Sequence, residues 1–373
     1  MPCTVSAGTA SDAALDALFV PFDAGELTFP AQGGVLVLRA REGIALREHI
    51  RPGWLLQQSF APATNALARH HYATIDDLGD AEDGGAVGAR LRAMGHPETF
   101  EFVLVLPTRQ REETRALFAR AMALVSPTGV VVASVPNAEG AKTAEADLVA
   151  LAGGVAQLSK HKCRVFWTRP GVAPDAALWR AWLAFDAPLP IDEGRYTSRR
   201  GLFAWDRIDT ASKLLIGVLP DDLHGHVADL GAGFGYLACE ALARNPGITG
   251  VDLFEAEGRA IEPARLNLAA AVARTGRDIA TRVEWHDVTL GVDGRYDAIV
   301  SNPPFHQGRA DDPTLGRAFI TTAARALVPR GRFWMVANRH LAYEATLAAC
   351  FGQVRTVVER DGFKVIEAKD PRP

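Results

Sequence analysis

"VADLGAGFGYLACEAL" occupies residues 227–242 and has the pattern of a strand, a glycine-rich turn and the start of a helix. The turn contains three glycines at alternate positions, Gly231, Gly233 and Gly235. Glycine there allows a tight turn and a close approach of backbone to ligand, and it leaves helix N-terminal amides available. The spacing is not the G-x-G-x-x-G of dinucleotide sites, and no P-loop lysine follows. We therefore predict a ligand-binding turn, with Asp229 at the strand end among its candidate residues.

The next strand ends in acidic residues. "ITGVDLFE" (248–255) ends at Glu255, 20 residues after Gly235. That is close to the distance at which an acid on the second strand meets a ribose diol in nucleotide-binding α/β domains. Asp252 in the same strand is the alternative. We favour Glu255, because one helix is expected to run from this acid to Asn267.

Two later strands also end in polar residues. The third strand ends in "VEWHDV", where Asp287 is a candidate acceptor for an adenine amino group or, equally, a helix cap. The fourth, in "YDAIVSNPPFHQG" (296–308), runs into Asn302, Pro303, Pro304 and Phe305. Neither proline can donate a hydrogen bond to a neighbouring strand, so the strand must end there. The turn presents a carboxamide, backbone carbonyls and a flat ring, which suit a planar substrate with an amino group.

Strand-like and helix-like segments alternate through the second half of the chain. The expected strands are 226–230, 248–255, 282–285, 296–301, 333–337, 354–359 and 364–368. Such alternation predicts an α/β fold with a mainly parallel sheet covered by helices on both faces. The candidate residues then lie together, because open sheets of this class bind ligands at the carboxyl ends of their strands.

The first half repeats part of this pattern. Residues 102–140 align with 296–344 through a strand, a proline stop, a helix rich in Ala and Arg, a proline-glycine turn and a second strand. The first half lacks the glycine cluster and has "LPTRQ" in place of "SNPPF". We interpret this as a duplicated domain that lost its site, although α/β domains also look alike in general. We predict domains at 1–190 and 191–373, with 186–203 as the linker.

Composition places limits on the function. With 48% hydrophobic and 23% charged residues, both domains can bury a core. The four cysteines (Cys3, Cys163, Cys239 and Cys350) are scattered, which predicts reduced thiols and no metal site. No apolar run reaches membrane-spanning length, and the N-terminus does not resemble a signal peptide, so we expect a cytoplasmic protein. The net charge of -4 gives no general argument for nucleic-acid binding.

The ordered motifs resemble a known family. "DLGAGFG", Glu255 to Asn267, "HDV" and "SNPPF" are together similar to class I S-adenosylmethionine-dependent methyltransferases of the N-PP-[FY] type. "LFAWDRIDTASKLLIGVLP" (202–220), "GRFWMVANRHLAYE" (331–344) and "DGFKVIEAK" (361–369) further resemble the ribosomal RNA guanine-N2 methyltransferases. The resemblance implies two tandem Rossmann-like methyltransferase domains, each with a mainly parallel seven-stranded sheet. The first would be degenerate and the second catalytic.

The resemblance also implies a reaction. S-adenosylmethionine would be the cofactor, held by Asp229, Gly231, Gly233, Gly235, Glu255, Asp287 and Asn302. Asn302 and the Pro303 carbonyl would accept the N–H hydrogens of a guanine amine, and Phe305 would stack on the base. The partner would be ribosomal RNA or a ribosomal subunit, 16S rather than 23S rRNA, acted on by a monomer.

Other readings remain open at this point. The chain could methylate adenine N6 or a protein glutamine, although those relatives more often carry tyrosine where Phe305 stands. It could also be a ribosome-assembly factor that binds S-adenosylmethionine with little turnover. Candidate RNA contacts are two basic groups, of which the first is Arg195, Arg199, Arg200 and Arg207 and the second is Lys160, His161, Lys162 and Arg164.

Overall fold

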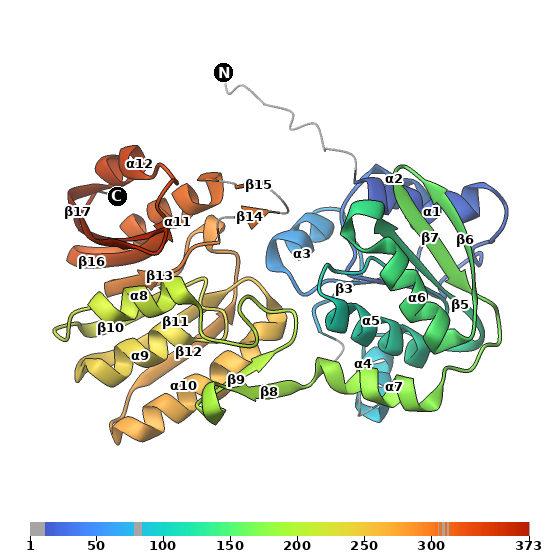
Figure 1. Cartoon of the computed structure of the whole chain (residues 1–373), viewed down its shortest axis with the longest axis horizontal. Coiled ribbons are helices and arrows are strands. Elements are labelled where there is room, and N and C mark those ends of the chain that lie inside the picture. Colours follow the sequence, from blue (N-terminus) through green and yellow to red (C-terminus); the bar gives the residue numbers. More distant parts are fainter. Residues whose placement is uncertain (1–11, 78–83, 305, 308–309, 312, 373) are drawn as a thin grey trace. The chain divides into compact units, whose positions relative to one another are not determined.

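The computed structural model describes residues 12–77, 84–304, 306–307, 310–311 and 313–372. The chain divides into two compact units, Met1–Ala187 (unit 1) and Pro188–Pro373 (unit 2). In Figure 1 unit 1 is coloured blue to green and unit 2 green to red. No helix in the described ranges is both long and apolar enough to cross a bilayer.

Unit 2 is built from strands alternating with helices. Its strands are β8 (Pro188–Ile191), β9 (Tyr196–Arg199), β10 (His224–Leu230), β11 (Gly247–Glu255), β12 (Ala280–Trp285), β13 (Tyr296–Ser301), β14 (His306–Gln307), β15 (Ala310–Asp311), β16 (Leu327–Asn338), β17 (Phe351–Arg360) and β18 (Phe363–Pro371). Its helices are α8 (Thr210–Val218), α9 (Tyr236–Arg244), α10 (Ile261–Thr275), α11 (Pro313–Ala326) and α12 (Glu344–Cys350), with short 3-10 turns η3 (Asp192–Gly194), η4 (Gly258–Ala260) and η5 (Val288–Leu290).

The main sheet of unit 2 has the order β12-β11-β10-β13-β16-β18-β17 within the described residues. The five strands from β12 to β16 pair in parallel, and β18 runs antiparallel to both β16 and β17. Helices α8, α9 and α10 cover one face of the sheet, and α11 and α12 cover the other (Figure 1). The predicted α/β architecture is confirmed.

Unit 1 repeats this plan. Its strands are β1 (Val35–Leu38), β2 (Leu55–Gln57), β3 (Thr74–Ile75), β4 (Phe100–Val105), β5 (Val125–Pro136), β6 (Val155–Lys160) and β7 (Cys163–Thr168). Its helices are α1 (Ala13–Asp23), α2 (Ile44–His49), α3 (Ala61–Ala68), α4 (Gly84–Ala93), α5 (Arg111–Leu124), α6 (Ala141–Ala152) and α7 (Ala176–Leu183), with 3-10 turns η1 (Asn137–Glu139) and η2 (Ala184–Asp186).

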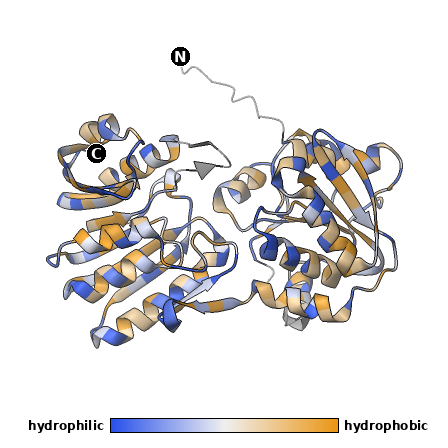
Figure 2. Cartoon of the chain, viewed as in Figure 1, coloured by the Kyte–Doolittle hydropathy of each residue, from blue (hydrophilic) through white to orange (hydrophobic). Residues whose placement is uncertain are grey.

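The two sheets have the same topology. In the described part of unit 1 the order is β3-β2-β1-β4-β5-β7-β6, which matches unit 2 strand for strand. Helices α1 and α2 pack on one face, whereas α5 and α6 pack on the other. Each face of each sheet therefore has its own apolar core. Figure 2 shows hydrophobic residues concentrated on the strands and hydrophilic residues on loops and outward helix faces.

The two units meet between Ala187 and Pro188, inside the expected linker 186–203, and that segment contains the antiparallel pair β8–β9. One local prediction was wrong. The helix expected from Glu255 instead begins at Ile261, after the 3-10 turn η4. The Glu257 side chain accepts a hydrogen bond from Arg259 N, 3.3 Å away, and so caps that turn.

The fifth strand in the order of each sheet, β5 in unit 1 and β16 in unit 2, contains a glycine at a matching irregularity. The pairing of β4 with β5 shifts between Phe100 and Phe102, and the pairing of β13 with β16 shifts at the equivalent place. Gly129 and Gly331 follow these shifts. A Cβ atom on Gly129 would lie 2.7 Å from the Glu101 carbonyl oxygen, and one on Gly331 would lie 2.9 Å from the Val328 carbonyl oxygen. The turns need glycine because backbone atoms fill the space of a side chain.

Gly331→Ala should therefore lower the free energy of unfolding by about 1–3 kcal/mol, as overpacking commonly does. The matched control is Gly217→Ala, on the exposed side of α8 in the same unit, where an added Cβ meets nothing within 4 Å. That change should stabilise by up to about 1 kcal/mol, since alanine favours helix. Urea denaturation of both variants checks the contrast, and equal stabilities would contradict it.

Candidate functional site

The glycine turn lies at the carboxyl end of β10. Gly231, Gly233 and Gly235 have φ values of 73°, 54° and 88°, a region that side chains rarely adopt. The amides of Gly231 and Ala232 donate to the Phe254 carbonyl oxygen at 2.9 and 3.1 Å. The turn is thereby fixed to the end of the neighbouring strand β11.

Glu255, the last residue of β11, binds the same turn. Its Oε2 accepts a hydrogen bond from Gly233 N at 2.7 Å, and its Oε1 accepts one from Glu257 N at 2.7 Å. Burial raises the pKa of this carboxyl group above its usual value, although the backbone donors oppose the shift. The acid favoured from the spacing therefore lies against the glycine turn.

Asp252, the alternative acid, is occupied elsewhere. Its Oδ2 accepts hydrogen bonds from Arg282 Nε at 3.0 Å, Arg282 Nη2 at 2.7 Å and the Tyr296 hydroxyl at 2.8 Å. His226 Nε2 lies 3.1 Å from the other oxygen, Oδ1. This buried carboxylate joins four neighbouring strands, which is a structural role.

Asp229 lies beneath the turn and is fully buried. Its Oδ2 accepts a hydrogen bond from Ala238 N at 3.1 Å, whereas Oδ1 has no partner among the described residues. Burial, reinforced by the charge of Glu255 and opposed by the Ala238 bond, raises the pKa of Asp229 to about 7. The strand end therefore carries an acid that is costly to ionise.

Asp287 follows β12 and caps the 3-10 turn η5. Its Oδ1 accepts hydrogen bonds from Thr289 N at 3.0 Å and from the Thr289 hydroxyl at 2.7 Å. The structure thus gives this residue the capping role that was the alternative from sequence. Its predicted contact with adenine stays a prediction.

Asn302 follows β13 and is held by α8. Its Nδ2 donates to Asp209 Oδ2 and to Ser212 Oγ, each at 3.0 Å. Its Oδ1 is buried and has no hydrogen-bond partner in the described part of the chain. Buried acceptors are seldom left unpaired, so such an atom indicates a site that receives a donor from a ligand.

The two prolines after Asn302 differ in exposure. Pro303 is buried and Pro304 is exposed. A Cβ atom added to Gly231 would lie 3.8 Å from Pro304 Cδ, so this turn is next to the glycine turn. Phe305, the predicted stacking ring, lies outside the described residues.

A cavity lies between these elements. It is lined by Phe203, Ala204, Asp209, Ser212, Gly231, Ala232, Gly233, Phe234, Tyr236, Leu237 and Asn302. The structure thus brings together three predicted site residues, Gly231, Gly233 and Asn302. It adds Ser212 and Phe203, which sequence reasoning missed. Phe203 as a residue is 63% exposed, which is high for a large apolar residue beside a cavity.

Most of the candidate RNA-contacting arginines have partners. Arg195 pairs with Glu240, Arg207 with Asp206 and Arg164 with Glu145. Arg199 is 5% exposed. The remaining basic group lies in the turn between β6 and β7, where residues 160–162 are all exposed. RNA contact there stays a prediction.

The corresponding place in unit 1 is filled by protein. Arg39 follows β1 as Gly231 follows β10, because Leu38 and Leu230 hold the same register against their neighbouring strands. Arg39 also has a positive φ, 57°. In place of an open turn, unit 1 has a long side chain.

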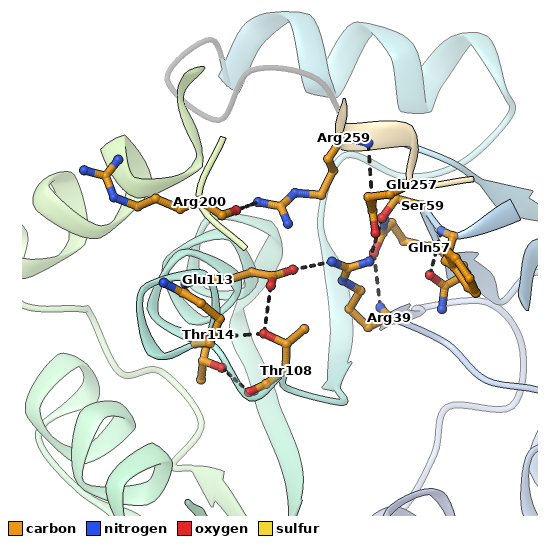
Figure 3. Close-up of polar contacts among 12 residues, drawn as sticks. Arg39, Gln57, Ser59, Thr108, Glu113, Thr114, Arg200, Glu257 and Arg259 are labelled. Atoms are coloured by element: carbon orange, nitrogen blue, oxygen red, sulfur yellow. Dashed lines mark hydrogen bonds and ion pairs between the residues drawn. The ribbon is translucent and has the colours of Figure 1, made fainter. Parts of the chain in front are cut away.

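That side chain enters a polar network shown in Figure 3. The Arg39 guanidinium donates to Ser59 Oγ at 2.7 Å and forms an ion pair with Glu113. The Thr108 hydroxyl donates to the other oxygen of Glu113 at 2.9 Å. Thr108 occupies the register position of Pro304, so side chains of unit 1 bridge the region that is a cavity in unit 2.

The described residues contain no cluster of three or more His, Cys, Asp or Glu side chains that could hold a metal ion.

The environment of Asp229 predicts a pH-dependent stability. In the folded state the carboxyl group of Asp229 keeps its proton up to a pKa of about 7, whereas the ordinary pKa of an aspartic acid, as in the unfolded chain, is 3.8, so folding becomes less favourable as pH rises through this window. Asp229→Asn cannot ionise. Its free energy of unfolding relative to the natural chain should therefore be lowest near pH 4 and rise toward pH 8. Chemical denaturation at several pH values measures this, and a constant difference would contradict it.

Comparison with known proteins places this geometry in a family. The model of the "Methyltransferase small domain" matches residues 193–367. A ribosomal RNA small subunit methyltransferase C from Yersinia enterocolitica is 31% identical over 272 residues, which is 71% of this chain and 73% of that protein. The one from Psychromonas ingrahamii is 28% identical over 270 residues, 72% of this chain and 75% of that protein.

A solved structure has the same two-unit fold. The T. thermophilus 16S rRNA N2 G1207 methyltransferase, in complex with AdoMet and guanosine, has a TM-score of 0.74 and 22% identity, over 96% of this chain and 92% of that chain. The fold predicted from the sequence and the family resemblance are both confirmed. The chain belongs to the family of the ribosomal RNA small subunit methyltransferase C.

Proposed function

We propose that this chain transfers a methyl group from S-adenosylmethionine to the exocyclic N2 amine of a guanine in small-subunit ribosomal RNA. The observation that carries the proposal is the buried Oδ1 of Asn302, which has no hydrogen-bond partner among the described residues and lies beside the glycine turn at the carboxyl edge of the sheet. The named relatives support the substrate, since they are small-subunit enzymes and the solved one was seen with AdoMet and guanosine.

The residues of the turn fit the cofactor. An added Cβ at Gly233 would meet nothing within 4 Å, so backbone and ligand can approach closely there. Glu255 would accept hydrogen bonds from the ribose hydroxyls, and Asp287 would accept one from the adenine amino group. When bound, the cofactor supplies an electrophilic methyl group on a sulfonium centre.

Asn302 would make the amine reactive. The lone pair of the guanine amine is delocalised into the ring, which makes it a weak nucleophile. The Asn302 Oδ1 and the Pro303 carbonyl oxygen would accept its two N–H hydrogens and favour a more tetrahedral nitrogen in line with the methyl group. No strong general base is needed, because the amine becomes acidic once it is methylated.

The target base must leave its stack to reach this cavity. We expect the substrate to be an unpaired or easily flipped guanine in partly folded RNA. Phe305 would stack on it, an interaction worth about 1–3 kcal/mol. Unit 1 would serve RNA recognition or structural support, and the enzyme would act in the cytosol, where ribosomal subunits are assembled.

A transfer assay with tritiated S-adenosylmethionine tests the proposal. Purified small subunits, large subunits and naked ribosomal RNA are offered, and the labelled product is digested to nucleosides. The expected label is N2-methylguanosine from the small subunit or its RNA. Label in adenine, label in protein, or a cofactor that binds without any transfer would each overturn it.

Asn302→Ala should abolish this transfer, because the amine then lacks an acceptor in the transition state. The affinity for S-adenosylmethionine should change only severalfold, since the mechanism assigns this amide mainly to the amine. Calorimetry and the transfer assay on one preparation separate the two effects. A variant with normal turnover would disprove the role of the amide.

Glu255→Ala should weaken S-adenosylmethionine binding by about 10- to 100-fold, the loss expected for hydrogen bonds to a charged group. Asp252→Asn is the control in the same strand. It should lower stability by disturbing the Arg282 and Tyr296 contacts but leave the dissociation constant nearly unchanged. The reverse pattern would transfer the ribose role to Asp252.

The Arg39 network predicts one cofactor site per chain. The guanidinium of Arg39 and the carboxylate of Glu113 occupy the place in unit 1 that corresponds to the glycine turn. Titration calorimetry with S-adenosylmethionine should give a stoichiometry of one, and Glu255→Ala should weaken all of the measured binding. A second site that survives in this variant would show that unit 1 also binds.

A further inference from the structure

We propose that Asp209 and Ser212, at the start of α8, are positioning residues that hold the Asn302 amide with its oxygen toward the substrate amine. This inference rests on the proposed function and deepens it. Its basis is the pair of hydrogen bonds from Asn302, in the turn after β13, to the start of α8. Asp209 lies 93 residues and Ser212 lies 90 residues before Asn302 in the sequence.

Both N–H hydrogens of the Asn302 amide are used by α8. An amide group has two donors on nitrogen and an acceptor on oxygen. Nδ2 lies 3.0 Å from Asp209 Oδ2 and 3.0 Å from Ser212 Oγ, and these are two separate acceptors. The donors are thus directed toward α8, which leaves Oδ1 for a ligand.

The opposite orientation of the amide is disfavoured. A half-turn about the side-chain bond would place Oδ1 against the Asp209 carboxylate, where two acceptors repel each other. It would also aim the N–H groups at the substrate, whose amine is itself a donor. The negative charge of Asp209 therefore selects the only orientation in which Asn302 can accept from an exocyclic amine.

The two acceptors are themselves fixed. Asp209 Oδ2 also accepts a hydrogen bond from Ser212 N at 2.8 Å and so caps α8. On the other side, the Ser301 hydroxyl donates to the Leu230 carbonyl oxygen at 2.7 Å, which ties the end of β13 to β10. The amide is thus held between a helix terminus and the sheet.

The bond to Asp209 should also strengthen Oδ1 as an acceptor. Hydrogen bonds to a carboxylate are shorter and stronger than neutral ones, and bonds in series polarise one another. An N–H donating to a charged acceptor moves electron density toward the oxygen of the same amide. Oδ1 then bonds best to the amine hydrogens as positive charge develops on the nitrogen in the transition state.

Three variants separate positioning from capping. Asp209→Ser keeps a good N-cap residue, but its hydroxyl is too short to serve both Ser212 N and Asn302. Ser212→Ala removes one acceptor and leaves the backbone amide for the cap. Asp209→Asn retains an acceptor oxygen that can serve the cap and the amide, and it removes only the charge.

The matched control is Asp175→Ser. Asp175 caps α7 in unit 1, where its Oδ1 accepts hydrogen bonds from Ala177 N at 3.0 Å and Leu178 N at 2.9 Å. It undergoes the same substitution at the same type of cap. Any effect of weakened capping alone should therefore appear in both aspartate variants.

The experiment measures kcat, the KM values for both substrates and the thermal midpoint of the full chain. Asp209→Ser should lower kcat by about 30-fold, in the range expected for a misplaced catalytic group, with the KM for S-adenosylmethionine nearly unchanged. Ser212→Ala should lower kcat less, and Asp209→Asn should retain more activity than Asp209→Ser. Asp175→Ser should keep kcat. Full kcat in Asp209→Ser, or an equal loss in both serine variants, would overturn the inference.

A reversal of the bond gives an independent check. Asn302→Asp replaces Nδ2, which lies 3.0 Å from Asp209 Oδ2, with a carboxylate oxygen. The two carboxylates should then repel each other, and methyl transfer should be almost lost. Adding Asp209→Asn restores a donor between the two positions, at the cost of the bond from Ser212 N that the same atom accepts, and the double variant should regain at least about tenfold in kcat over Asn302→Asp, a typical strength for a charge-assisted bond. A double variant no better than Asn302→Asp would contradict the coupling.

Failure of the proposed function can be told apart from failure of this inference. If the natural chain labels N2-methylguanosine and Asp209→Ser is equally fast, only the inference fails. If the natural chain labels no guanine, the proposed function fails. The side-chain amide NMR signal of Asn302, assigned by its absence in Asn302→Ala, then tests the contact alone. It should shift in Asp209→Ser and stay in place in Asp175→Ser, and an unmoved signal would overturn the contact.

Discussion

The hydrogen bonds between the glycine turn and the end of β11 are the constraint on which the site depends. Gly231 and Ala232 donate to the Phe254 carbonyl oxygen, and Gly233 donates to Glu255. They are possible because the parallel register sets Leu230 opposite Phe254 on one side and Ser301 on the other. This register therefore brings the glycine turn, the carboxylate of Glu255 and the side-chain amide of Asn302 to the same edge of the sheet. The helices hold that edge by covering both faces of the sheet.

The two units show how one framework supports opposite outcomes. Their strand orders agree, and so does the irregularity at Gly129 and Gly331. One difference is the residue after the matching strands β10 and β1, which is Gly231 in unit 2 and Arg39 in unit 1. The arginine keeps the left-handed backbone of the turn, which is unfavourable for a residue with a side chain, and it forms an ion pair with Glu113. The framework is thus tolerant, and the chemistry depends on a few positions at the strand ends.

The sequence was sufficient for the fold and for the carboxyl ends of the four strands that carry the site. Alternating apolar segments predicted the strands, and prolines and glycines marked where they end. The sequence favoured Glu255 over Asp252 only by its spacing from the glycines. It could not show that Asp252 accepts hydrogen bonds from Arg282 and Tyr296, because these two residues come from other strands. It gave no indication that Asp209 bonds to Asn302, since the register of α8 against β13 arises only from tertiary packing. The left-handed backbone of Arg39 could not be predicted from the sequence either, because arginine does not favour that conformation.

The turn after β1 contains the Arg39 side chain, whereas the glycine turn after β10 does not contain a side chain of this kind. The stability of the two units should therefore depend differently on ligand concentration. In unit 1 the guanidinium of Arg39 is part of the chain itself, so the packing of this turn does not depend on the concentration of a ligand. In unit 2, Asp229 Oδ1 and Asn302 Oδ1 have no hydrogen-bond partner among the described residues, and the proposed cofactor and substrate would bind beside them. A ligand that binds only the folded state stabilises it by mass action. The lifetime of unit 2 against local opening is therefore coupled to the supply of its ligand, whereas that of unit 1 is not.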